Sequence, residues 1–209
     1  IAVVHRSGES DRANVEIFNQ EMAKHGKSVL GTAVLERDST NVASAVAAIR
    51  AVKPQTVVFF NNSKPFAEFI RAFRSSSQGT QFVAISAVGP GFVKDLGADA
   101  HGVLVVQVVP LPTAVKVPLV AEYRRQLEAL DPRIEPSLAG VEGFIAAKTL
   151  VEGLRRAGGN PTAGALSGAL DNLRHFELGG YPISFTSTNH NGSNYVDISI
   201  ISANGHFMS

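Results

Sequence analysis

The 209-residue sequence contains no cysteine. Without cysteine the chain can form no disulfide, no thiolate nucleophile and no zinc site that uses sulfur. The six histidines are widely spaced, and none lies in an HxxxH or HExxH motif. We therefore predict no metal ligand, no catalytic residue and no cofactor.

The chain also lacks a long apolar run and an excess of charge of one sign. Its longest apolar stretch, residues 102–111, is interrupted by Gln107 and is far shorter than the roughly 20 residues of a membrane helix. Nineteen basic residues face eighteen acidic ones. Such a balance gives no reason to expect nucleic acid or an anionic membrane as a partner. We expect neither nucleic-acid binding nor direct insertion into a membrane.

Phosphate-binding and nucleophile motifs are missing as well. No GxGxxG follows the first apolar run, no GxxxxGK[ST] occurs, and Ser7-Gly8-Glu9-Ser10 does not form a GxSxG elbow. An enzyme of the Rossmann or flavodoxin-like kind is therefore the least favoured interpretation.

What the sequence does contain is an alternation of apolar runs and helical periods over its first hundred residues. The apolar runs predict strands at residues 1–4, 28–35, 56–60, 81–85 and 102–109. Between them we expect one helix from an N-cap at Ser10 or Asp11 to about residue 25, a second that starts at residues 38–40, and a third from Pro65. Continuous apolar strands between amphipathic helices indicate an α/β fold with a doubly wound parallel sheet.

The pattern changes after residue 109. Three prolines between residues 110 and 118 indicate a linker or hinge, and helices are expected at about 117–130, 137–157 and 161–173. Short strands are expected at 183–185, 195–201 and 206–208, with hairpin-type turns at 189–192 and 203–205. The middle helix carries apolar residues at helical spacing: Phe144, Ala147, Leu150, Val151 and Leu154.

Three segments, taken together and in order, resemble one family. They are RDSTNVASAVAAIRAVKPQTVVFF, EGFIAAKTLVEGLRRAGGNPTAGALSGAL and FELGGYPISFTSTNHNGSNYVDISII. They are similar to the Leu/Ile/Val-binding type of periplasmic solute-binding protein that serves ABC importers. The resemblance implies a type I periplasmic binding fold, in which ligand is held between two α/β lobes.

The resemblance also implies a division of the chain. Residues 1–110 would form the second α/β lobe, 111–118 a hinge crossing, 119–180 a helical segment that packs on the first lobe, and 181–209 the return crossing and closing strands of the second lobe. The opening half of the first lobe has no counterpart, and the chain opens on a buried-strand pattern, so we expect a fragment or a processed chain. Helices around Phe144 should then expose an apolar patch that drives association.

The resemblance implies a protein that binds a ligand and catalyses no reaction. The chain would be the periplasmic component that captures a small solute (an amino acid, an aromatic or carboxylic acid, or an amide) and delivers it to the membrane permease of an ABC importer. It would not be an enzyme. The alternative is a ligand-sensing domain of a receptor or regulator with the same fold, because function depends on sites rather than on the fold.

The family places ligand contacts on loops after the strands of the second lobe and on one helix of the other segment. Carried over by position, the candidate residues are Ser10, Asn61, Asn62, Ser63, Ser86 and Phe144. Each has a plainer explanation: an N-cap for Ser10, turn chemistry for residues 61–63, the end of a strand for Ser86, and helix packing for Phe144.

Ser86 bears on the identity of the ligand. Amino-acid-binding members of the family commonly place a carboxylate near this position, where it pairs with the α-ammonium group of the ligand. Serine cannot supply that charge. We therefore expect a carboxylic acid, an aromatic acid or an amide at least as readily as an α-amino acid.

Overall fold

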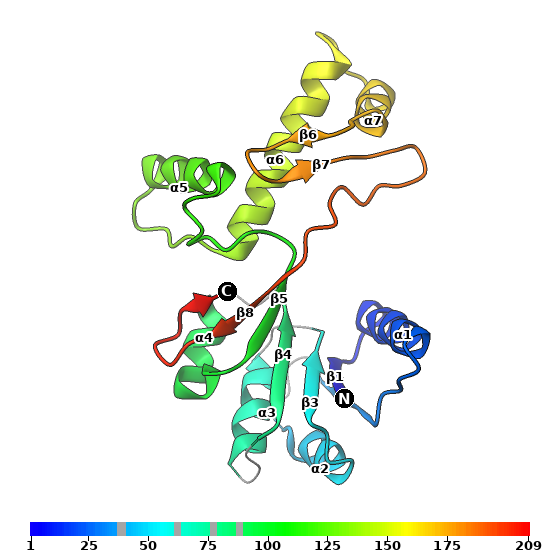
Figure 1. Cartoon of the computed structure of the whole chain (residues 1–209), viewed down its shortest axis with the longest axis vertical. Helices are drawn as coiled ribbons and strands as arrows, with labels where there is room; N and C mark the ends of the chain where they lie inside the picture. The colour runs from blue at the N-terminus through cyan, green and yellow to red at the C-terminus, as the bar shows by residue number, and fades with distance from the viewer. Residues whose placement is uncertain (37–40, 61–63, 76–78, 87–89) are drawn as a thin grey trace. The chain divides into compact units, whose positions relative to one another are not determined.

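The computed structural model describes residues 1–36, 41–60, 64–75, 79–86 and 90–209. The predicted site residues Asn61, Asn62 and Ser63 lie outside the described residues. The chain forms two compact units, one of Ile1–Gln107 with Ile198–Ser209 and one of Val108–Asp197 (Figure 1). The last twelve residues thus belong to the same unit as the first hundred.

A seven-stranded sheet is the centre of the first unit. Its strands are β1 (Ala2–Arg6), β2 (Thr32–Leu35), β3 (Thr56–Phe59), β4 (Gln81–Ile85), β5 (Leu104–Gln107), β8 (Asp197–Ile201) and β9 (Phe207–Met208). They lie in the order β2-β1-β3-β4-β5-β8-β9. The neighbouring pairs from β2 to β5 are parallel, and β9 is antiparallel to β8. The prediction of a doubly wound parallel sheet is confirmed.

The helices of this unit lie on both faces of the sheet. They are α1 (Glu9–Lys24), α2 (Ala43–Ala51), α3 (Lys64–Arg74), α4 (Pro90–Leu96) and a 3-10 turn, η1 (Gly97–Ala100). The connection from β1 to β2 runs in the opposite direction along the sheet from the connections that follow it. Because such crossovers are right-handed, α1 covers one face while α2, α3 and α4 cover the other.

The face under α3 is packed with phenylalanine. Phe59 of β3 and Phe82 of β4 meet a stripe on α3 that consists of Phe66, Phe69 and Phe73. Neighbouring ring centroids in this cluster lie 5.1–5.9 Å apart, and all five rings are at most 1% exposed. Ring pairs at this spacing add about 0.5–1.5 kcal/mol each beyond simple burial. The apolar stripe of α3 therefore forms the core of this face of the unit.

The start of α1 differs from the prediction. Neither Ser10 nor Asp11 is the N-cap, because the helix begins at Glu9 and its N-cap is Gly8, which offers no side-chain hydrogen bond. Asp11 lies in the first turn of α1, its residue is only 4% exposed, and its carboxylate lies 3.6 Å from Nε of Arg6. The buried carboxylate thus forms an ion pair with the residue that ends β1.

Two further helix starts were wrong in the sequence reading. The second helix begins at Ala43 with Val42 as its N-cap, later than residues 38–40, of which the structure describes nothing. A helix also begins at Pro90, where the sequence analysis predicted none. Proline is well suited to the first turn of a helix, since its missing N–H would find no partner there.

The second unit is helical, with one small hairpin. Its elements are α5 (Pro118–Leu130), α6 (Leu138–Ala157), α7 (Ala163–Asp171), β6 (Phe176–Glu177) and β7 (Pro182–Ile183). The starts of two helices follow from local sequence. The hydroxyl of Ser137 accepts a hydrogen bond from the backbone N–H of Gly140 at 3.1 Å, and that of Thr162 accepts one from Ala165 at 3.2 Å.

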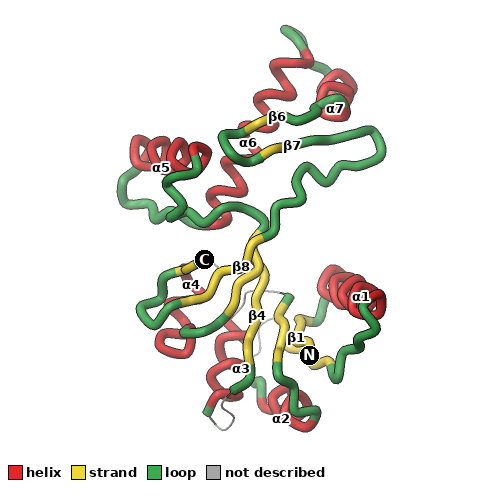
Figure 2. Tube along the Cα trace, viewed as in Figure 1, coloured by secondary structure: helices red, strands yellow, loops and turns green. Residues whose placement is uncertain are grey.

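The hairpin does not form where the sequence suggested. β7 pairs with β6 across Gly179 and Gly180, whose φ angles of 73° and 92° favour glycine. The stretch 184–196 contains no strand and runs as a long loop (Figure 2). The turn expected at residues 203–205 does join β8 to β9, and its Gly205 has a φ of 80°.

The buried side of α6 is also not the predicted one. Leu138, Val141, Ile145, Thr149 and Gly153 are buried on this helix. By contrast Leu150, Val151 and Leu154 of the predicted stripe are 47%, 63% and 37% exposed. The helix therefore packs within its unit on one side and presents an apolar stripe on another.

Candidate ligand-binding site

The strand order locates the candidate site in the first unit. In an open α/β sheet, ligands bind beyond the carboxyl ends of the strands at the point where the strand order reverses. Here that point lies between β1 and β3, since β2 lies on one side of β1 and β3, β4 and β5 follow on the other. The carboxyl ends of β1, β3 and β4 therefore meet at the expected edge.

A partly buried arginine lies at this point. Arg6 ends β1, and its side chain is 21% exposed. Its Nε lies 3.6 Å from the Asp11 carboxylate, which is beyond ordinary hydrogen-bond length, and it makes no hydrogen bond to any described residue. The ion pair with Asp11 thus places a positive charge at the end of β1.

The loop after β1 is fixed by neighbouring polar contacts. The hydroxyl of Ser7 donates to the Glu36 carboxylate at 2.7 Å, and the backbone N–H of Ser7 donates to the carbonyl of Leu35 at 3.1 Å. Both contacts tie this loop to the end of β2. The edge therefore has a defined backbone on the side where Arg6 lies.

Two of the predicted residues lie on this edge. Ser10 is exposed in the first turn of α1, and Ser86 is half-buried in the turn that follows β4. Because β3 lies between β1 and β4, the two serines flank the end of β3 from opposite sides. Residues 61–63, which follow β3, lie outside the described residues, so the predicted set stays a prediction.

The remaining predicted residue, Phe144, lies on α6 in the second unit. It is half-buried, and its ring centroid lies 5.7 Å from that of Tyr123 on α5. The ammonium of Lys148 lies 5.5 Å from the same ring. These contacts hold Phe144 between α5 and α6, as expected of a packing residue; its role toward a ligand stays a prediction.

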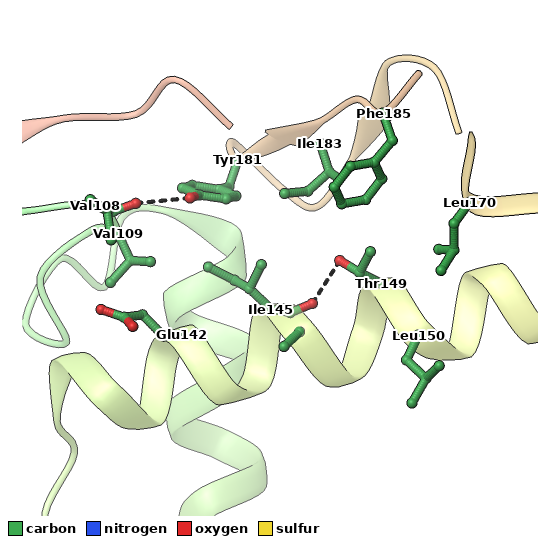
Figure 3. Close-up of a pocket in the computed structure, with 11 residues that line it drawn as sticks. Val108, Val109, Glu142, Ile145, Thr149, Leu150, Leu170, Tyr181, Ile183 and Phe185 are labelled. Carbon is green, nitrogen blue, oxygen red and sulfur yellow. Dashed lines mark hydrogen bonds between the residues drawn. The ribbon is translucent and has the colours of Figure 1, made fainter. Parts of the chain in front are cut away.

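The second unit has a pocket of about 370 Å³ beside α6 (Figure 3). Its walls come from α6, from α7, from the hairpin and from the segment that precedes α5. The lining residues are Val108, Val109, Glu142, Ile145, Ala146, Thr149, Leu150, Leu170, Tyr181, Ile183 and Phe185.

The hydroxyl groups of this pocket are already engaged. Thr149 donates to the carbonyl of Ile145, and Tyr181 donates to the carbonyl of Val108, both at 2.8 Å (Figure 3). Glu142 supplies the charge in an otherwise apolar wall. A polar solute would find little here to orient it, because recognition needs donors and acceptors that are not already paired. We therefore place the candidate site at the sheet edge.

The sequence analysis did not name Arg6 as a candidate residue. The available signal was a charged residue at the end of an otherwise apolar strand, directly before the predicted turn. Among the described residues no group of histidine, aspartate and glutamate side chains could hold a metal ion, and no helix is long and apolar enough to cross a membrane.

Comparison with known proteins places the chain in a family. A model of the periplasmic binding protein family matches residues 1–205. The chain belongs to this family. No curated protein matches it.

Solved structures show the same fold. A substrate-binding periplasmic protein from Ralstonia solanacearum is 26% identical, with a TM-score of 0.87 over 99% of this chain and 60% of its own. A possible leucine/isoleucine/valine-binding protein from Rhodopirellula baltica is 24% identical, with a TM-score of 0.89 over 100% of this chain and 58% of its own. An R. palustris solute-binding protein in complex with benzoate is 17% identical, with a TM-score of 0.80 over 99% and 56%. The chain thus spans less than two thirds of the length of these relatives.

Proposed function

We propose that this periplasmic binding protein is the ligand-binding component of an ABC importer. It captures a small solute in the periplasm and delivers it to a membrane permease, and it makes and breaks no bond. The family match over residues 1–205 is the observation that carries the proposal. Closure of two lobes around the ligand supplies the mechanism, because the ligand shifts the population toward the state that it binds more tightly.

The predicted lobes and site residues belong to this proposal. Residues 1–110 and the closing strands form the second lobe, and residues 119–180 pack on the first lobe beyond the hinge at 111–118. The ligand contacts lie at Ser10, at residues 61–63 and at Ser86, with Phe144 reaching the ligand from the other lobe. Arg6 joins them on the strength of its position at the end of β1.

The ligand class follows from charge at the sheet edge. Arg6 places a guanidinium charge there, whereas Ser86 carries no charge to pair with an α-ammonium group. A guanidinium suits a carboxylate because two parallel N–H groups can bind its two oxygens. We propose a carboxylic acid, with an aromatic acid such as benzoate as the first candidate. The benzoate-bound relative supports this choice by analogy.

A thermal-shift series on the protein as its gene encodes it tests the function. The ligands are benzoate, a short fatty acid, benzamide and leucine. A ligand at 100 times its Kd stabilises the folded state by about 2.7 kcal/mol, which raises the Tm by several degrees. We expect benzoate or the fatty acid to raise the Tm and leucine to leave it unchanged.

Matched variants then test the site. Arg6→Lys keeps the charge but loses the paired donors, so the shift caused by the acid should fall, whereas Arg12→Lys on the exposed side of α1 should keep it. An acid-induced shift that survives in Arg6→Lys removes Arg6 from the site. A shift with leucine alone overturns the proposed ligand class, and no shift with any of the four ligands counts against a transport role for small acids.

A further inference from the structure

The chain passes twice between its two units. The first passage leads from Gln107, the last residue of β5, to Val108. The second leads from Asp197 to Ile198 at the start of β8. We call these two points the first and the second crossing. Because β5 and β8 are neighbours in the sheet, the chain leaves and re-enters the first unit on adjacent strands.

A buried hydrogen bond joins the two crossings on the side of the first unit. The hydroxyl of Ser199, the residue after Ile198, donates to Oε1 of Gln107 at 3.0 Å. Ser199 is 1% exposed and Gln107 is 0% exposed. Breaking this bond would leave buried polar groups unpaired, which is costly. The two chain segments are therefore fixed to each other where they meet the sheet.

On the side of the second unit, one side chain contacts the segments at both crossings. The hydroxyl of Tyr181 donates to the carbonyl of Val108, the residue after the first crossing, at 2.8 Å (Figure 3). The ring centroid of Tyr181 lies 5.6 Å from that of Tyr195, two residues before Asp197 and the second crossing. Tyr181 is 4% exposed. It thus links the segment that enters the second unit to the segment that leaves it.

The backbone of Tyr181 is held by contacts that involve neither crossing. Its N–H donates to Oε1 of Glu177 at 3.0 Å, and its carbonyl accepts a hydrogen bond from the N–H of Leu178 at 3.2 Å. In the same hairpin, the carbonyl of Gly179 accepts a hydrogen bond from the N–H of Leu119 at the start of α5, at 3.0 Å. Tyr181 is therefore anchored to the helical part of the second unit, and its side chain can restrain the two crossing segments.

These contacts assign Tyr181 a role in the lobe movement on which the proposed function rests. We propose that Tyr181 is a positioning residue that holds the two crossing segments together and so limits the range of arrangements that the two units sample. Binding between two lobes costs conformational entropy, because the ligand selects one arrangement from this range. A narrower range lowers that cost and raises the affinity, as preorganisation does in general. Tyr181 would act in this way without touching the ligand.

Removal of one hydroxyl group separates this role from simple packing. Tyr181→Phe keeps the ring beside Tyr195 but removes the hydrogen bond to Val108. The matched control is Tyr123→Phe, which also removes the hydroxyl of a buried tyrosine in the second unit. The Tyr123 hydroxyl accepts a hydrogen bond from the N–H of Ser137 at 3.3 Å, between α5 and α6. Both variants lose one buried contact, but only Tyr181→Phe releases a crossing segment.

Distances between two spin labels measure the range of arrangements directly. Residues 1–209 contain no cysteine, so Ser28→Cys in the first unit and Leu130→Cys in the second introduce one exposed label site each. The protein is used as its gene encodes it, with any cysteine outside residues 1–209 replaced by serine. Pulsed electron paramagnetic resonance without ligand should give a wider distance distribution for Tyr181→Phe than for the parent and for Tyr123→Phe. The Kd for benzoate, measured by calorimetry, should rise about tenfold in Tyr181→Phe alone, which corresponds to freeing the backbone of about one residue.

The two measurements fail independently of each other. A folded Tyr181→Phe with the same distance distribution as the parent overturns the inference, and so does a wider distribution with an unchanged Kd. A wider distribution with a raised Kd supports it. If benzoate does not bind the parent, that result counts against the proposed ligand class, and the label distances alone decide whether Tyr181 restrains the crossings. Tyr195→Leu, which removes the ring contact next to the second crossing, repeats the test if Tyr181→Phe fails to fold.

Discussion

A buried polar pair at the end of β5 allows a sharp test of the packing in the first unit. Gln107 is 0% exposed and Ser199 of β8 is 1% exposed. The Ser199 hydroxyl donates to Oε1 of Gln107 at 3.0 Å, whereas Nε2 of Gln107 finds no hydrogen-bond partner among the described residues. The amide is therefore satisfied at one end and not at the other.

Two substitutions have opposite consequences for this pair. Ser199→Ala removes the hydroxyl donor and leaves the Gln107 amide unpaired at both ends. An unsatisfied buried group costs about 1–3 kcal/mol, a large part of a typical stability of about 5–15 kcal/mol. The double variant Gln107→Met with Ser199→Ala replaces both partners by apolar groups, and such a replacement is nearly neutral or stabilising. We expect the double variant to be more stable than Ser199→Ala by at least about 1 kcal/mol.

Urea unfolding followed by circular dichroism measures these differences. Ser28→Ala, at an exposed position, serves as the matched control and should change the free energy of unfolding by less than about 0.5 kcal/mol. The reasoning is refuted if the double variant is less stable than Ser199→Ala, because the Gln107 amide would then make favourable contacts at Nε2 as well.

Three further outcomes follow from the second unit. Gly140→Ala would place a Cβ on the Tyr123 hydroxyl and should destabilise the protein by about 1–3 kcal/mol, whereas Gly143→Ala on the same helix meets no atom within 4 Å and should stabilise it by up to about 1 kcal/mol, both measured by urea unfolding. Hydrogen bonds from Arg155 and from the arginine after it lower the pKa of Glu152 from 4.5 to about 2. A lowered pKa stabilises the folded state above pH 4.5, and this contribution is lost as the pH falls toward 2, so Glu152→Gln should weaken the acid dependence of unfolding between these values. The apolar stripe of α6 should make a protein of these 209 residues associate, and a clean monomer in light scattering would contradict that expectation.

The sequence predicted the first unit well because its strands and helices carry strong local patterns. β4 begins and ends at the predicted residues, and the stripe on α3 is the phenylalanine core. In the second unit, Ser137 caps α6 as its residue type suggests. In each case the physical cause lies within a few residues: a strand buried on both faces has a continuous apolar run, and a cap is a local hydrogen bond.

The candidate site was only partly predictable. The carboxyl edge of the sheet follows from the order of strands and helices, so Ser10 and Ser86 could be placed near it from sequence. Arg6 could not be singled out in this way, because its importance depends on its burial and on the Asp11 carboxylate across a turn. The charge of Arg6 is visible in the sequence, whereas its pairing with Asp11 depends on how α1 packs after β1.

The sequence by itself determined the class of fold, the order of its elements and the family, since each depends on patterns along the chain. Tertiary structure decided which of several apolar surfaces are covered. On α6 the predicted stripe with Leu150 is exposed, while the side with Ile145 is buried. On the sheet, Val3 is covered and Ile198 is not. In each comparison the covered and the exposed residues are equally apolar in the sequence. Only the segments that pack against them distinguish covered from exposed, because burial depends on residues far away along the chain.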